Sequence, residues 1–104
     1  MSKKKFTYLL LFLLAGFFTG LKAQFSIQGK VTDSATGNPL SFVNIIEITS
    51  GKGMVTDIDG HFSLKNIFPD DTLQISFVGY QTKTIPGREL QGKRFLSVSM
   101  DKRS

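Results

Sequence analysis

The residues best suited to chemistry stand together in the segment DIDGH, residues 57–61. Two carboxylates one residue apart, Asp57 and Asp59, suggest a hard cation such as calcium, which needs several oxygen ligands. An EF-hand loop counted from Asp57 requires glycine at its sixth position and glutamate at its twelfth, where this chain has Phe62 and Phe68. The spacing excludes that loop, and we predict no metal site.

A turn explains the same residues without any ligand. Asp59-Gly60 is a favoured hairpin dipeptide, because both central residues of a type I′ turn have positive φ. We therefore expect Asp57, Asp59 and Gly60 to form a turn, and His61 to lie at the surface beside it. His61 is the single histidine and the chain has no cysteine, so a zinc site with several His or Cys ligands is excluded.

A serine nucleophile has no supporting pattern either. The sequence contains no G-x-S-x-G elbow, and both aspartates that could orient His61 already serve the turn. We predict no catalytic residue, no bound cofactor and no enzymatic activity.

The elements that carry this turn must fit in one small domain, because the chain has 104 residues.

Residues 1–23 have the three parts of a secretory signal: a lysine-rich start, an apolar run over residues 6–18, and a cleavage site that we place between Ala23 and Gln24. The run is short for a membrane span, which needs about 20 apolar residues. An uncleaved anchor reaching Leu21 is the alternative. After removal of the signal we expect no transmembrane segment.

Charge argues against a nucleic-acid partner. Four of the 13 Lys and Arg residues lie in the signal segment and all 8 acidic residues follow it. The remainder, residues 24–104, is therefore close to neutral, and the high isoelectric point of the whole chain does not indicate a basic binding surface.

Residues 24–104 are predicted to be all-β. Apolar residues alternate with polar ones in short stretches separated by turn formers, which is typical of an antiparallel sandwich, with a small barrel as the alternative. The phase of residues 42–48 is ambiguous, and a bulge or two-sided burial would explain it. We expect seven strands, over residues 25–32, 42–48, 54–56, 61–65, 72–77, 81–85 and 95–100.

One of these stretches is mostly polar and suits the edge of a sheet. It comprises Gln81, Thr82, Lys83, Thr84 and Ile85. An edge strand of this kind can accept a strand from a partner protein, so these residues are a candidate contact surface. The neighbouring Tyr80 could belong to an exposed aromatic platform, but we favour a buried ring with its hydroxyl bonded to backbone.

Three stretches together resemble the carboxypeptidase regulatory-like domain: GKVTDSATGNPLSFVNI at residues 29–45, GMVTDIDGHFSL at 53–64 and LQISFVGYQTKTI at 73–85. The resemblance implies a transthyretin-like, seven-stranded antiparallel Greek-key β-sandwich following the signal helix. Domains of this family are accessory to metallocarboxypeptidases, or extend TonB-dependent outer-membrane transporters at the N-terminus. Glu47 departs from the pattern, because another apolar strand residue is expected there.

The combined expectation is an exported, non-catalytic interaction module of the cell envelope of a Gram-negative bacterium, in the periplasm or at the outer membrane. It would act alone or as the N-terminal part of a TonB-dependent transporter-like protein. Its partner is expected to be a periplasmic or outer-membrane protein. A small carbohydrate-binding module, with a glycan as ligand, is the alternative.

Overall fold

The computed structural model describes residues 23–104. The expected signal segment, residues 1–23, lies outside the described residues except for Ala23. Within the described part of the chain, no helix combines the length and the hydropathy that a membrane crossing requires.

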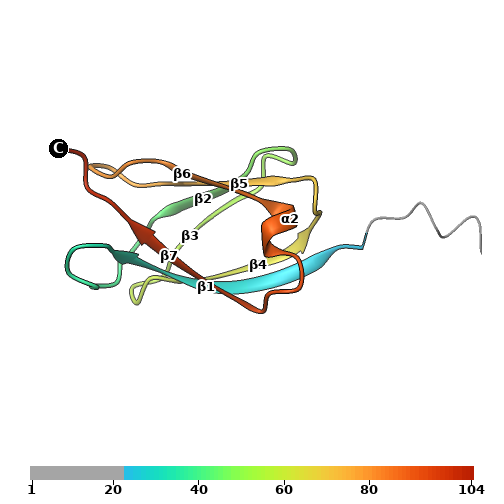
Figure 1. Cartoon of the computed structure of the whole chain (residues 1–104), viewed down its shortest axis with the longest axis horizontal. Coiled ribbons are helices and arrows are strands. Elements are labelled where there is room, and N and C mark those ends of the chain that lie inside the picture. The colour runs from blue at the N-terminus through green and yellow to red at the C-terminus, as the bar shows by residue number, and fades with distance from the viewer. Residues whose placement is uncertain (1–22) are drawn as a thin grey trace, which may run out of the picture.

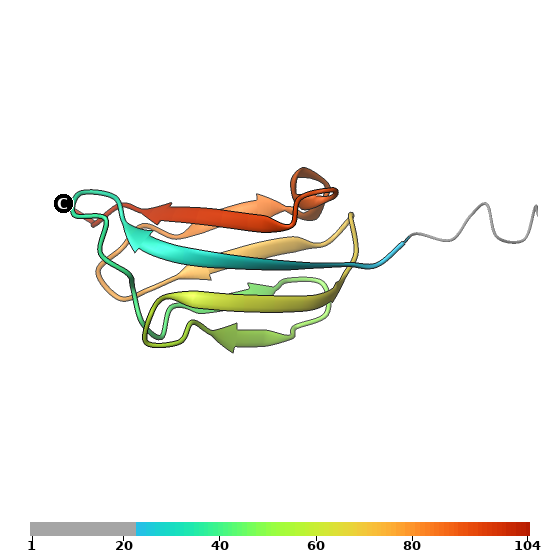
Figure 2. The same cartoon turned by 90° about the horizontal axis from the view of Figure 1, so that it is seen from below.

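Two β-sheets face each other, and Figures 1 and 2 show them as two layers. One sheet has the strand order β4-β1-β7 and the other has the order β3-β2-β5-β6. The all-β sandwich expected from the alternating pattern is confirmed. The strands are β1 (Phe25–Asp33), β2 (Asn44–Glu47), β3 (Gly53–Val55), β4 (His61–Ile67), β5 (Thr72–Ser76), β6 (Lys83–Pro86) and β7 (Phe95–Met100).

The core lies between the sheets, and side chains from both layers fill it. Alternate residues point inward, as the pleat of a β-strand requires, except in β4, where the alternation breaks at Asn66 and the register with β1 shifts. Within residues 23–104 the core has no disulfide support, so apolar burial must hold the layers together. The buried apolar residues are Ile27, Val31, Val43, Ile45, Phe62, Leu64, Ile67, Leu73, Ile75, Tyr80, Leu90, Val98 and Met100.

The expectation of purely antiparallel pairing is wrong at one place. β1 and β7 run parallel, with Gln28 opposite Phe95 and Asp33 opposite Met100. The cause is the connection: after β6 the chain crosses to the other sheet through α2 (Gly87–Leu90) and enters β7 at the end of the sandwich where β1 begins (Figure 1).

The single turn of helix α2 was not expected, because four residues are too few to show a helical period. It starts after Pro86, whose φ of −63° suits the start of a helix. Leu90 on this turn is buried at the end of the core.

The ambiguous phase of residues 42–48 resolves without a bulge and without two-sided burial. Val43, Ile45 and Glu47 point inward, whereas Ile46 and Ile48 remain 38% and 51% exposed on the outer face. Pairing with β5 places Ile45 directly opposite Ile75. Because the two apolar side chains pack together on the inner face, this pairing decides which residues of β2 point inward.

Gly29 allows the layer β4-β1-β7 to pack closely. Gly29 pairs directly with Phe62, and a Cβ atom added to Gly29 would overlap the Phe62 ring and the Leu96 carbonyl. Because both neighbours belong to paired strands, neither can move far, and only glycine fits this position.

We therefore predict that Gly29→Ala lowers the free energy of unfolding by about 1–3 kcal/mol through overpacking. Urea denaturation of the purified chain measures this. Gly53→Ala is the matched control, because a Cβ at that strand position meets its nearest atoms at an ordinary 3.6 Å. Equal losses for the two variants would contradict the close packing of Phe62 on Gly29.

Candidate functional site

A groove of about 510 Å³ opens along the side of the sandwich where β3 and β4 lie. These strands belong to different sheets and are the outermost strands on this side. A smaller hollow of about 160 Å³ shares Met54 and Ser63 with the groove and extends it toward Lys52 and Lys65. The groove is lined by Gln28, Gly29, Phe42, Met54, Val55, Thr56, Asp57, His61, Phe62, Ser63 and Phe95.

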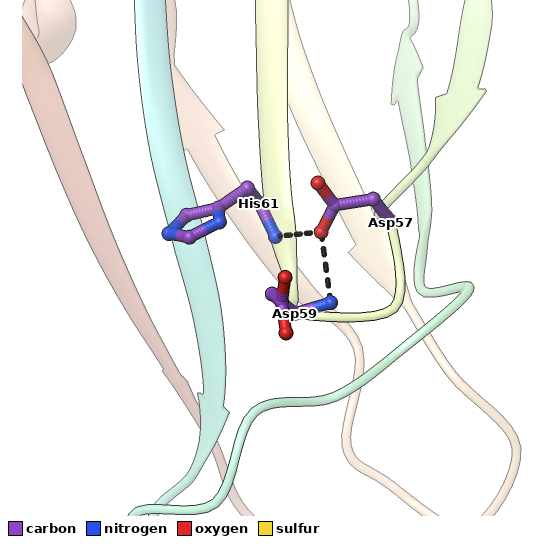
Figure 3. A group of neighbouring side chains, drawn as sticks. All are labelled: Asp57, Asp59 and His61. Atoms are coloured by element: carbon purple, nitrogen blue, oxygen red, sulfur yellow. Dashed lines mark hydrogen bonds between the residues drawn. The ribbon is translucent and has the colours of Figure 1, made fainter.

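The turn predicted from Asp57, Asp59 and Gly60 closes one end of the groove. The Asp57 carboxylate accepts hydrogen bonds from the N–H groups of Asp59 at 3.0 Å and His61 at 2.8 Å (Figure 3). The Gly60 N–H donates to the Asp57 carbonyl at 3.0 Å. Gly60 has a φ of +78°, so glycine is needed there.

The type of turn differs from the expected type I′ hairpin. Among the described non-glycine residues, positive φ occurs only at Phe42 and Asn66, so Asp59 does not adopt it. The turn also joins β3 of one sheet to β4 of the other. The two bonds to the Asp57 carboxylate hold the turn in a form that requires positive φ only at Gly60.

Asp57, Asp59 and His61 offer ligand atoms that lie within 4.8 Å of one another, and all three side chains are exposed. Sequence reasoning excluded an EF-hand and placed His61 at the surface beside this turn, and the structure has it there. One Asp57 oxygen already accepts two backbone hydrogen bonds. The arrangement stabilises the turn and places negative charge at this end of the groove.

Phe42 stands at the rim of the groove in an unusual conformation. Its φ is +61°, a region that bulky residues rarely adopt and that costs about 1–3 kcal/mol. Its ring is 64% exposed. Sequence patterns could not reveal this residue as special, because Phe42 reads as an ordinary member of an apolar strand.

Thr56 holds Phe42 in this position. The Thr56 hydroxyl donates to the Leu40 carbonyl at 2.8 Å and accepts from the Val43 N–H at 3.0 Å. The Thr56 carbonyl accepts from the Phe42 N–H at 3.0 Å. Thr56 is fully buried, so these bonds are shielded from water and fix the chain on both sides of Phe42.

The candidate contact surface at residues 81–85 lies on the other side of the sandwich. Lys83, Thr84 and Ile85 belong to β6, which is an edge strand, and Gln81 and Thr82 precede it. The Lys83 ammonium donates to the Ser99 carbonyl of β7. The Gln81 N–H donates to the Asp101 carbonyl at 2.9 Å. On this side, contacts therefore connect the two sheets.

Tyr80 is buried, and its hydroxyl partner is a side chain rather than the expected backbone group. The hydroxyl donates to the Asp33 carboxylate at 2.6 Å, while the other Asp33 oxygen accepts from the N–H groups of Ala35 and Thr36. The Tyr80 hydrogen bond is the main reason that the pKa of Asp33 falls from 3.8 to about 2. This cluster joins the end of β1 to the loop before β6.

Glu47 occupies an inward position of β2 and is buried. Burial, followed by the nearby charge of Asp71, raises the pKa of Glu47, while Lys52 and a hydrogen bond from Ser50 act in the opposite direction. The pairing that the sequence left open is settled, because Glu47 lies opposite Leu73 of β5.

Residues 27–101 match the family model described as the CarboxypepD_reg-like domain. Over 90 residues the chain is 36% identical to the TonB-dependent receptor SusC of Bacteroides thetaiotaomicron, which covers 83% of this chain and 9% of the relative. Over 79 residues it is 34% identical to the TonB-dependent receptor P39 of Formosa agariphila, and this match covers 74% of this chain and 8% of the relative. The aligned region spans less than a tenth of the length of these curated relatives.

Among solved structures, a streptococcal ancillary pilin is similar, with a TM-score of 0.50 and 15% sequence identity. The similarity covers 79% of this chain and 30% of the pilin chain. At this identity the likeness concerns the fold alone.

We predict that Thr56→Val lowers the free energy of unfolding by about 1–3 kcal/mol, because the buried Val43 N–H loses its partner while the side-chain shape is kept. Chemical denaturation measures the loss. Thr56→Ser, which keeps the hydroxyl, is the control and should lose less. A Val variant as stable as the Ser variant would show that the hydroxyl does not hold this junction.

The lowered pKa of Asp33 predicts a dependence of stability on acid. Because the folded-state pKa lies below the ordinary value, the carboxylate contributes stability above pH 3.8 that is lost as the pH falls toward 2. Tyr80→Phe removes the main cause, so its melting temperature should be lower at neutral pH and fall less between pH 4 and 2. Lys102→Gln is the control, because Lys102 has the smallest effect on the pKa of Asp33. Parallel acid profiles for wild type and Tyr80→Phe would refute the assignment.

Proposed function

The chain belongs to the CarboxypepD_reg-like domain family, and from this premise we propose that it is an exported, non-catalytic accessory module of a Gram-negative cell envelope. Its task is to hold a protein partner of the periplasm or outer membrane. The observation that carries the proposal is the match of residues 27–101 to this family, together with identity to two TonB-dependent receptors. Family membership also supports the absence of catalysis, because such domains accompany an active protein.

The place of the module in a longer chain is part of the same proposal. The relatives are more than ten times as long as the aligned region, which supports a role as the N-terminal part of a TonB-dependent transporter-like protein. The strand orders β4-β1-β7 and β3-β2-β5-β6 are the basis for proposing the transthyretin-like Greek-key connection that the resemblance implies.

Binding through a sheet edge is the proposed mechanism. An edge strand presents N–H and C=O groups that a partner's strand can pair with. The segment Gln81 to Ile85, with β6 at its centre, is one such edge. It is exposed at Gln81, Thr82, Lys83 and Thr84, although Pro86 limits the length of the ladder that can form.

A carbohydrate-binding module is the second candidate. Two exposed aromatic rings, Phe42 and Phe95, line the groove at 64% and 52% exposure. Gln28, Ser63 and His61 provide hydrogen-bonding groups beside them. Binding of the purified chain on a glycan array would favour this candidate over a protein partner.

Export provides the direct test of the proposed location. A C-terminally tagged chain expressed in a Gram-negative host should appear in the envelope fraction with Gln24 as its first residue, as measured by mass spectrometry. Leu11→Arg interrupts the apolar run and should retain the precursor in the cytoplasm. Recovery of the wild-type chain in the cytoplasm with its first 23 residues intact would overturn the proposal.

A further inference from the structure

The two sides of the sandwich differ in how far their sheet edges are closed. On the side of β6 and β7, Lys83 is bonded to the Ser99 carbonyl and Tyr80 forms a bridge with Lys102. On the side of β3 and β4, the edges are separated by the groove and its extension. We propose that this groove is the docking site for an extended strand of a partner protein, which pairs antiparallel with β4. This inference rests on the proposed function, but it places the partner strand at the β4 edge rather than at β6, and it identifies the chemistry of the partner.

The dimensions of β4 suit a short strand. β4 is the longest of the four outermost strands, and the part that lines the groove and its extension runs from His61 to Lys65. The N–H and C=O groups of His61 are both bonded to Asp57, so the part open to pairing begins at Phe62. At a rise of about 3.4 Å per residue, this part pairs with roughly four residues of a partner strand. An antiparallel pair is favoured, because its hydrogen bonds are perpendicular to the strands and slightly more stable.

The groove wall indicates which side chains the partner presents. Met54 is partly exposed between the two edges, and the buried side chains of Phe62 and Leu64 lie behind it. A strand paired with β4 directs every second side chain toward this surface. The partner therefore carries alternating apolar residues, of which the β-branched types pack best on a pleated surface.

Charge sets the direction of the partner strand. Asp57 and Asp59 are exposed at the end where β4 begins, and Lys52 and Lys65 are exposed at the end where it finishes. An antiparallel strand places its C-terminal end beside the two aspartates. The complementary partner thus has an acidic residue at its N-terminal end and a basic residue at its C-terminal end.

Phe42 provides a second, independent observation. A residue held at positive φ with an exposed aromatic ring is strained and unsatisfied in the isolated domain. Phe42 lines the groove, so a docked strand would cover the ring. Buried aromatic side chains commonly contribute most of the binding free energy at an interface.

The test uses two fluorescent peptides with the purified chain. The first is acetyl-Glu-Val-Thr-Val-Thr-Val-Arg-amide, and the second replaces the final Arg with Glu. We expect the first peptide to bind more tightly, as measured by fluorescence anisotropy. Phe42→Gly should weaken it about tenfold without loss of melting temperature, because glycine adopts positive φ freely.

Asp59→Arg is the charge-exchange variant, since the Asp59 side chain is exposed. It should weaken binding of the first peptide and strengthen binding of the second, each by about two- to fivefold, as expected for a surface charge pair. The preference between the two peptides is thereby reversed. Thr84→Pro alters the opposite edge in β6 and should leave peptide binding unchanged, with its melting temperature as the control for folding.

Each contrary result has a defined meaning. If Thr84→Pro abolishes peptide binding while Phe42→Gly and Asp59→Arg keep it, the groove is not the docking site. That result would instead support binding at the β6 edge. Binding of glycans with no binding of either peptide overturns the groove as a peptide site and supports the second candidate function. Failure of export overturns the proposed function whatever the peptides do.

Discussion

The buried hydroxyl of Thr56 is the interaction on which the open side of this sandwich depends. It bonds to the backbone at Leu40 and Val43, and so joins the long connection after β1 to the segment after β3. Between these two anchor points lies Phe42, whose N–H is held by the Thr56 carbonyl. Because the bonds are buried, their net stabilisation can offset the unfavourable backbone conformation of Phe42. This junction therefore fixes the rim of the groove at Phe42, while the turn at Asp57 is held by its own hydrogen bonds.

The opposite side of the sandwich is organised by charge. Asp33 is buried at the end of β1 and accepts bonds from the Tyr80 hydroxyl and from two backbone N–H groups. Lys102 lies 4.0 Å from the same carboxylate. These contacts bring the last described residues against the loop before β6, while the chain enters β1 at the far end of the sandwich (Figure 1). On this side the domain's own residues connect the two sheets, whereas the groove lies on the side of β3 and β4.

This asymmetry fits an accessory domain better than an active centre. The Asp57 carboxylate of the turn is used to hold backbone. The groove beside it is lined by residues of the β3 and β4 edges, with acidic side chains at one end and lysines at the other. Shape and complementary charge are the features by which binding modules select their partners. The fold itself is shared by proteins with different tasks, so the function is argued from this surface and from the family rather than from the sandwich.

The sequence alone determined the strands, because alternating apolar residues and turn formers act locally. The strands over residues 25–32, 72–77 and 95–100 could be placed on this basis, and the family could be recognised from three motifs. The tertiary structure decided what depends on contacts between distant segments: the parallel pairing of β1 with β7, the inward phase of β2 and the partner of Tyr80. It also decided the positive φ of Phe42 and the meeting of the β3 and β4 edges around a groove. These features arise only when the two layers pack, and no local pattern encodes them.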